Sequence, residues 1–136
     1  MKERDLMIGD LVTYTGDDEG PITASIEGIN EDSDFGVEIL GTCERIEDIE
    51  PIPLTAEILE KNGFESRDNF YEITFQTNKI DNSIFRIAEF EKSGNWFFGF
   101  FDFPNLIENF RINYVHELQH ALRLCGLNEL ADNFKI

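Results

Sequence analysis

The chain has 136 residues, enough for one domain or for two small ones packed together, and 41% of them are hydrophobic. Its 28 acidic and 11 basic side chains give a formal net charge of −17. Such a field repels nucleic-acid backbones and anionic membranes, since both need lysine and arginine to replace their counterions. The charged start MKERDLMIGD lacks the apolar run of a secretory signal, and no segment is apolar over the ~18 residues that span a membrane. We therefore expect a cytoplasmic protein.

The negative charge is concentrated in the first half of the chain. Residues 1–55 hold 15 acidic and 3 basic side chains, a net charge of −12, whereas residues 56–136 have a net charge of −5. The simplest interpretation of this charge is solubility. The alternative is a functional surface that attracts basic partners or mimics nucleic acid.

The first half of the sequence has the pattern of short strands separated by turn residues. The predicted strands are 10–15, 22–29, 35–40, 43–46 and 49–52. Five short strands at this spacing are typical of a small barrel or a strongly bent sheet. We therefore predict an SH3-like β-barrel over about residues 5–53.

The second half predicts a helix, three strands and a final helix. Pro51 and Pro53 mark the boundary, since proline cannot donate a hydrogen bond within a sheet. Thr55 as N-cap and Gly63 beyond the C-terminus predict a helix over 56–62. The ranges 70–77, 83–90 and 96–103 predict an antiparallel meander, and a last helix follows over about 113–125. This α-β-β-β-α unit, residues 54–136, makes the protein α+β, and it could form one compact domain with the barrel.

The third strand of this meander is rich in phenylalanine on both of its faces. A strand that is apolar on both sides is either buried between two layers or contributes to an interface between subunits. A core position is the first expectation. A homodimer formed through this strand is the second.

The final helix has an apolar and a polar face. At ~100° per residue, the apolar arc holds Tyr114, Val115, Leu118, Ala121, Leu122, Leu124 and Cys125. The opposite face holds His116, Gln119, His120 and Arg123. We expect this polar face to meet water or a partner, which makes these four residues a candidate interaction face.

Residues 116–120 spell HELQH, which matches the zinc-protease pattern HExxH. On a helix, histidines at i and i+4 point the same way and can bind zinc, while the glutamate activates the bound water. His116 and His120 are therefore candidate metal ligands, with Glu117 as the candidate base. This is the alternative hypothesis of a zinc-dependent hydrolase.

Several features count against catalytic zinc. The chain has only two histidines, and after His120 the carboxylates are Glu129 and Asp132, with no second helix predicted to hold them. Arg123 stands beside both histidines, and its fixed positive charge opposes a dication. The polar face also lies opposite the predicted core, where so short a chain offers little material for a cleft. The motif is therefore interpreted as an ordinary polar helix face, and we expect no catalytic residues and no bound metal.

Other chemical signatures are missing from the sequence. No glycine-rich phosphate loop occurs, and no serine or cysteine has a nearby histidine and aspartate in sequence. The acidic run Glu44–Glu50 lacks the ligand spacing of an EF-hand. Cys43 and Cys125 follow no ligand or redox spacing, so we expect both to be buried and reduced. No cofactor is predicted.

Four segments are distinctive: Leu6–Val12 (LMIGDLV), Ile46–Thr55 (IEDIEPIPLT), 56–64 (AEILEKNGF) and 114–122 (YVHELQHAL). Their order resembles a family of small uncharacterised proteins from Bacteroidetes genomes and their phages or mobile elements. The family patterns are an RIGN-V start, a PIPLTEEILLKNGF centre and a YVHQLQN helix. The resemblance spans nearly the whole chain, and the family has no established activity.

The resemblance also bears on the HELQH segment. Members of that family often carry glutamine where this chain has Glu117, and asparagine where it has His120. Only His116, Leu118 and Gln119 then fit the family pattern. The resemblance implies that His116 and Gln119 are a surface feature of the family and that zinc chemistry is not.

The sequence therefore predicts a non-enzymatic protein-interaction module, a phage or mobile-element accessory protein. Its expected partner is a basic or apolar protein, because the charge of the first half disfavours nucleic acid. One alternative is an acidic nucleic-acid mimic that inhibits a DNA-binding protein. The other is the zinc-dependent hydrolase.

Overall fold

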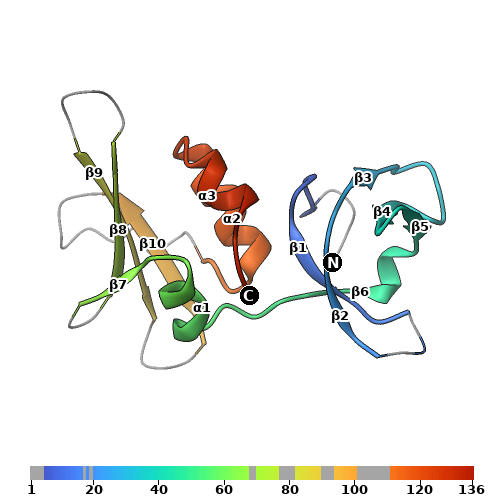
Figure 1. Cartoon of the computed structure of the whole chain (residues 1–136), viewed down its shortest axis with the longest axis horizontal. Helices are drawn as coiled ribbons and strands as arrows, with labels where there is room; N and C mark the ends of the chain where they lie inside the picture. Colours follow the sequence, from blue (N-terminus) through green and yellow to red (C-terminus); the bar gives the residue numbers. More distant parts are fainter. Residues whose placement is uncertain are drawn as a thin grey trace.

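The computed structural model describes residues 5–16, 18, 20–67, 70–76, 82–89, 94–100 and 111–136. These residues form small antiparallel sheets and three α-helices, which confirms the predicted α+β class. In Figure 1 the helices α2 (Val115–Leu124) and α3 (Asn128–Asp132) lie between the strands of the N-terminal half and the sheet of the C-terminal half. No helix in the described part of the chain is long and apolar enough to cross a membrane.

The N-terminal half contains two three-stranded antiparallel sheets, ordered β2-β1-β6 and β3-β4-β5. The strands are β1 (Leu11–Tyr14), β2 (Ile22–Ser25), β3 (Gly28–Ile29), β4 (Val37–Ile39), β5 (Thr42–Glu44) and β6 (Ile49–Pro51). The predicted strand at 22–29 is divided because the chain passes from one sheet to the other. The N–H of Ile26 donates to the carbonyl of Asp10 beside β1, whereas the N–H of Glu27 donates to that of Glu38 in β4 (2.8 Å each). The described strands therefore form two linked sheets and do not close into one barrel.

A small apolar core lies between these two sheets. Residues on alternate positions of a strand point to the same face, so Ala24 is buried while its neighbours Thr23 and Ser25 are exposed. The buried set is Leu6, Val12, Ala24, Ile26, Val37, Ile39 and Ile49. Burying each large aliphatic side chain contributes roughly 1.5–3 kcal/mol.

The helix α1 (Ala56–Lys61) follows the two prolines, and the predicted helix at 56–62 is confirmed to within one residue. Thr55 has extended backbone angles, and its side chain accepts a hydrogen bond from the N–H of Ile58 (3.3 Å). It therefore caps the first turn, as its hydroxyl predicts. At the other end Gly63 adopts φ of +85°, a conformation that favours glycine, and the chain leaves the helix there.

The C-terminal half contains the predicted meander, β8 (Tyr71–Gln76), β9 (Asn82–Glu89) and β10 (Trp96–Phe100). A short unpredicted strand, β7 (Glu65–Ser66), extends the sheet to the order β10-β9-β8-β7. Trp96 is buried, and its indole N–H donates to the carbonyl of Leu54 (3.1 Å), which ties the sheet to the segment before α1. The predicted strand end at 101–103 and the side chains of 98–100, on which the homodimer prediction depends, lie outside the described residues.

The predicted final helix is α2, which begins at Val115 and ends at Leu124. The predicted apolar arc is confirmed for Val115, Leu118, Ala121 and Leu122, which are buried. The prediction is wrong for Leu124, which lies in the last turn and is 82% exposed. The helix α3 was not predicted, and it brings Ala131 and Phe134 into the core of this half.

The two halves meet along α2 and along the segment that precedes it. The N–H of Val115 donates to the carbonyl of Ile52, and the N–H of Leu54 donates to that of Asn113 (2.9 Å each). Leu11 of β1 packs against the apolar core of the C-terminal half. One side of α2 therefore faces its own sheet, and the other faces the N-terminal half.

Candidate functional site

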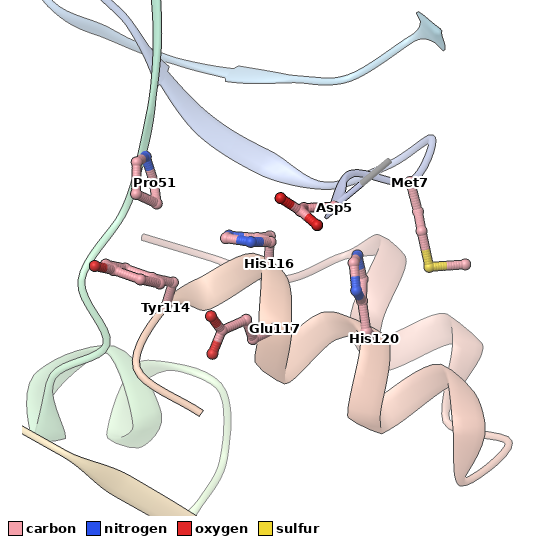
Figure 2. A pocket seen from close by; sticks show the side chains of 7 residues that line it. All are labelled: Asp5, Met7, Pro51, Tyr114, His116, Glu117 and His120. Carbon is pink, nitrogen blue, oxygen red and sulfur yellow. The ribbon is translucent and has the colours of Figure 1, made fainter. Parts of the chain in front are cut away.

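The HELQH segment borders a pocket at the junction of the two halves (Figure 2). Its volume is about 590 Å³, and it is lined by Asp5, Met7, Pro51, Tyr114, His116, Glu117 and His120. The first three belong to the N-terminal segment and β6, and the other four belong to the N-cap and the first two turns of α2. Ligand sites are often concave surfaces of this size between structural units. The expectation that so short a chain leaves little material for a cleft is therefore wrong.

His116 forms part of the pocket wall and is only 5% exposed. Its ring stacks on Tyr114, with 5.9 Å between ring centroids and 12° between planes. Its Nδ1 atom is buried and has no hydrogen-bond partner among the described residues. Burial lowers the pKa of His116 below its ordinary value of 6.5, although the charges of Asp10, Glu117 and Asp5 act in the opposite direction. The ring is therefore neutral at pH 7.

His120 and Arg123 hold one buried carboxylate, that of Asp10. His120 Nε2 lies 2.6 Å from Asp10 Oδ2, and Arg123 Nη1 donates to Asp10 Oδ1 (2.7 Å). The N–H of Met7 also donates to Oδ2 (2.7 Å), and the Asp10 side chain is fully buried. Because a carboxylate only accepts hydrogen bonds, His120 donates through its Nε2–H group in this contact. These contacts join the start of β1 to the middle of α2.

Gln119 is fully buried and uses both ends of its amide to join three segments. Its Oε1 accepts from the N–H of Leu11 (2.8 Å), and its Nε2 donates to the carbonyls of Gly9 (3.0 Å) and Ala131 (2.9 Å). A buried amide group is costly unless it is satisfied, and here the backbones of β1 and α3 satisfy it. Gln119 is therefore a structural side chain at the centre of the molecule.

Glu117 stabilises the first turn of α2. Its Oε2 accepts from the N–H of Asn113 (2.9 Å), which precedes the N-cap residue Tyr114. A glutamate at the third helical position that reaches back to a backbone N–H resembles one half of a capping box. A structural role therefore accounts for the glutamate that the HExxH pattern would assign as a base.

The geometry does not support the zinc hypothesis. A catalytic zinc site needs three protein ligands, but His120 Nε2 is occupied by Asp10. No group of three or more histidine, cysteine, aspartate or glutamate side chains in the described ranges is arranged to hold a metal ion. A second helix, α3, does follow His120, although the sequence did not predict it. Its Asp132 is not a third zinc ligand, because this side chain lies 3.6 Å from Arg123 Nη2 and does not line the pocket.

The prediction that the polar face of this helix meets water or a separate partner is wrong for His116 and Gln119, which are buried. His120 and Arg123 are only partly exposed, and both are paired with Asp10. The sequence pattern correctly separated this face of the helix from the C-terminal core. The pattern did not show that the N-terminal half of the same chain covers the polar face.

A second concave surface lies entirely within the N-terminal half. It has a volume of about 550 Å³ and is lined by Glu31, Asp32, Ser33, Asp34, Arg45, Ile46 and Glu47. Arg45 donates to Glu47 (3.2 Å) and also lies over the ring of Phe35, with 5.4 Å between the guanidinium carbon and the ring centroid. Phe35 is 47% exposed. An exposed aromatic side chain therefore contacts Arg45, which lines this acidic concave surface.

Asp10, which organises the contact between the two halves, is not among the functional residues that the sequence pattern predicts. A signal was present, because Asp10 is a lone charge between apolar residues at the start of a predicted strand. Such a carboxylate needs hydrogen-bond donors when it is buried. Its partners lie 110 and 113 residues further along the chain, so local patterns could not identify them.

Comparisons of the chain with protein-family models, curated proteins and solved structures found no match.

Proposed function

We propose that this protein is a non-enzymatic interaction module that binds a basic protein partner through the acidic surface of its N-terminal half. The observation that carries the proposal is the concave surface bordered by Glu31, Asp32, Asp34 and Glu47. All four of these side chains are exposed. A hollow with carboxylates at its edge is complementary to a protruding basic segment.

The wider charge of this half supports the same partner class. Its exposed acidic residues are Asp5, Asp18, Glu27, Glu31, Asp32, Asp34, Glu38, Glu47 and Glu50. Arg45 is the single base among the described residues up to Pro51, and it is paired with Glu47. Such a field accelerates encounters with cations and opposes the approach of a phosphate backbone.

Phe35 supplies an apolar contact next to these carboxylates. Aromatic residues are enriched in the centres of protein interfaces, where a ring fills a depression on the partner. A partner that presents an apolar residue flanked by lysine or arginine would meet both features. This combination favours a protein ligand over a small inorganic cation.

At the level of architecture, we propose that the two linked sheets of residues 5–53 are an open form of an SH3-like barrel. We also propose that residues 54–136 form a second unit packed on it as one compact domain. Support comes from the six short antiparallel strands around a shared apolar core and from the contacts of α2 with β1. The resemblance of four segments to a family from Bacteroidetes and phages supports a role as a cytoplasmic phage or mobile-element accessory protein.

The test is affinity capture from a lysate of the native host with two matched variants of the whole protein. One variant carries Glu31→Gln, Asp32→Asn and Asp34→Asn at the concave surface. The control carries Glu57→Gln, Glu60→Gln and Glu129→Gln on exposed helix positions of the other half. Both lose three negative charges, so a nonspecific effect of net charge would be equal in the two.

We expect a basic protein to be retained by the wild type and by the control, and to be lost from the first variant. Retention should weaken as salt rises, because exposed charges are screened. Equal retention by both variants would contradict the proposed surface. Capture of a DNA-binding protein that added DNA displaces would instead favour the nucleic-acid mimic.

A further inference from the structure

We propose that the outer edge of β5, the side of this strand that does not face β4, binds an extended lysine- or arginine-rich segment of the basic partner. The segment pairs with β5 as an added antiparallel strand. This inference rests on the proposed function and deepens it, since it names the form in which the partner is bound. The edge adjoins the acidic concave surface, because Arg45, which lines that surface, directly follows β5.

The backbone groups of Cys43, in the middle of β5, point away from the sheet. A two-residue turn, 40–41, joins β4 to β5, so the flanking pair, Ile39 and Thr42, is hydrogen-bonded. Hydrogen-bonded and non-hydrogen-bonded pairs alternate in antiparallel strands, so the next pair, Glu38 and Cys43, is not hydrogen-bonded. The N–H and C=O of Cys43 therefore face the outer edge, where no strand in the described part of the chain pairs with β5. Such an edge is a template for a strand from another chain.

The outer edge of β5 is accessible to another chain. Thr42 and Cys43 are both exposed. Figure 1 shows β5 at the end of the N-terminal half that is remote from α2 and from the sheet of the C-terminal half. An incoming strand therefore reaches this edge without any change in how the two halves pack.

The charges around β5 select a basic segment. Neighbours across antiparallel strands share a face, so a partner residue opposite Cys43 lies on the same face as the exposed carboxylate of Glu38. Glu47, also exposed, lies just beyond β5 in the lining of the acidic concave surface. By contrast β2, another edge strand of this half, contains no charged residue. Opposite charges on neighbouring strands stabilise their pairing, which favours lysine or arginine at β5.

A shallow hollow on the same face of the sheet can receive the stem of such a side chain. Its volume is about 280 Å³, and its lining includes Gly28, Phe35, Glu38 and Cys43. Gly28, Glu38 and Cys43 are neighbours across β3, β4 and β5. A Cβ atom at Gly28 would lie 2.9 Å from Glu38 Oε2, so the glycine leaves room for this carboxylate. Long basic side chains bury their methylene groups against apolar surfaces, which the ring of Phe35 supplies.

Contacts within the N-terminal half fix β5 in its extended form. The carboxylate of Glu27 accepts from the N–H of Gly41 in the turn before β5 (2.9 Å), and the hydroxyl of Tyr14 donates to Glu44 (2.9 Å). An edge that is already ordered loses little conformational freedom when it binds. Leu40 in the same turn has φ of +50° and is 61% exposed, although glycine or asparagine suits this conformation better. An exposed apolar side chain in a strained conformation at the end of the edge indicates a contact with another molecule.

The experiment is an NMR titration of the whole protein with capped peptides at constant ionic strength. The parent peptide repeats lysine–valine three times. Alternate N–H groups of an extended strand point to opposite edges, so a lysine opposite Cys43 bonds to β5 through its own N–H, whereas the valine N–H groups point away. Two further peptides carry N-methyl groups on all three lysines or on all three valines, and both keep the charge of the parent. A fourth peptide has glutamine in place of each lysine.

We expect the parent and the valine-methylated peptide to shift the amide signal of Cys43 saturably and to slow the hydrogen exchange of its N–H. The lysine-methylated peptide should bind about tenfold more weakly or worse, because it loses the hydrogen bonds to β5. The glutamine peptide should bind roughly fivefold more weakly or worse, because it lacks the charge that the carboxylates attract.

A pair of protein variants tests the charge on the sheet face. Glu38→Gln should weaken binding of the parent peptide roughly threefold, the size expected for an exposed ion pair. The matched control, Glu57→Gln on α1 of the other half, loses the same charge at an exposed position and should leave the affinity unchanged. Equal binding of the two methylated peptides, equal binding of the glutamine peptide, equal effects of the two variants or an unprotected Cys43 N–H would each overturn the strand pairing.

The two proposals fail in distinguishable ways. The triple amide variant leaves the residues of β5 unchanged, and the methylated peptides report on β5 without the native partner. If the triple variant loses the protein partner while the two methylated peptides bind equally well, only the strand pairing is wrong. If the triple variant keeps the partner, the proposed function is wrong, whatever the peptides do.

Discussion

The Nε2 atom of His120 lies 2.6 Å from the Oδ2 atom of Asp10, although 110 residues separate them in the chain. With Arg123 on the other carboxylate oxygen, this contact fastens α2 to the start of β1. Gly9, next to Asp10, permits the close approach, since a Cβ atom there would lie 2.9 Å from Arg123 Nη2. The helix face that carries the zinc-protease pattern is thus a contact between the two halves.

The first prediction concerns the stability that Asp10 contributes. Asp10→Ala leaves the side chains of His120 and Arg123 without their buried partner, and removing one member of a buried ion pair costs roughly 3–5 kcal/mol. We expect a loss of about this size in the free energy of unfolding measured with urea. Asp34→Asn, at an exposed position, should stay within about 0.5 kcal/mol of the wild type. A similar small effect for Asp10→Ala would mean that the two halves are held together elsewhere.

The second prediction concerns Gln119, which satisfies three backbone groups. Gln119→Met keeps the length of the side chain but leaves these groups without their partner. Because an unsatisfied buried group costs about 1–3 kcal/mol, we expect a loss of roughly 3 kcal/mol or more in urea unfolding. The comparison is Leu124→Gln on the same helix, where an 82% exposed side chain should have almost no effect. Equal losses for the two variants would refute the role assigned to the amide.

Local patterns in the sequence predicted most of the elements for clear physical reasons. Thr55 supplied a capping hydroxyl, and the alternation of apolar residues together with the turn residues marked the strands of the meander. The helix α3 could not be found this way. It has five residues, and its N-cap, Leu127, makes no side-chain hydrogen bond to it.

Long-range contacts limited the prediction of the sheets and of the site. The break at Ile26 and Glu27 depends on pairing with Asp10 and Glu38, which local periodicity does not show. The four polar residues of α2 were identified correctly as one face. The N-terminal half was not identified as the surface that this face contacts, because a pattern of polar positions cannot distinguish solvent from a polar contact within the same chain.

The third prediction concerns the two cysteines, both of which were expected to be buried. That expectation is wrong for Cys43, which is exposed, whereas Cys125 is partly buried. Burial raises the pKa of the Cys125 thiol to about 11, so it is almost entirely protonated at neutral pH and a poor nucleophile. We expect Ellman's reagent to modify Cys43 quickly and Cys125 slowly in the folded protein. Cys43→Ser should abolish the fast phase, and a fast phase that persists would contradict the burial of Cys125.

The fourth prediction follows from the neutral ring of His116. Its pKa in the folded protein is lowered by burial below 6.5, so the unfolded chain takes up a proton more readily than the folded one. The corresponding stability is fully present above pH 6.5 and is lost as the pH falls through the folded-state pKa. We expect the wild type to lose more unfolding free energy between pH 7.5 and 5 than His116→Gln does. Both proteins share Asp5, Asp10, Glu117 and His120, so the difference isolates His116. Parallel pH profiles would contradict a neutral, buried His116.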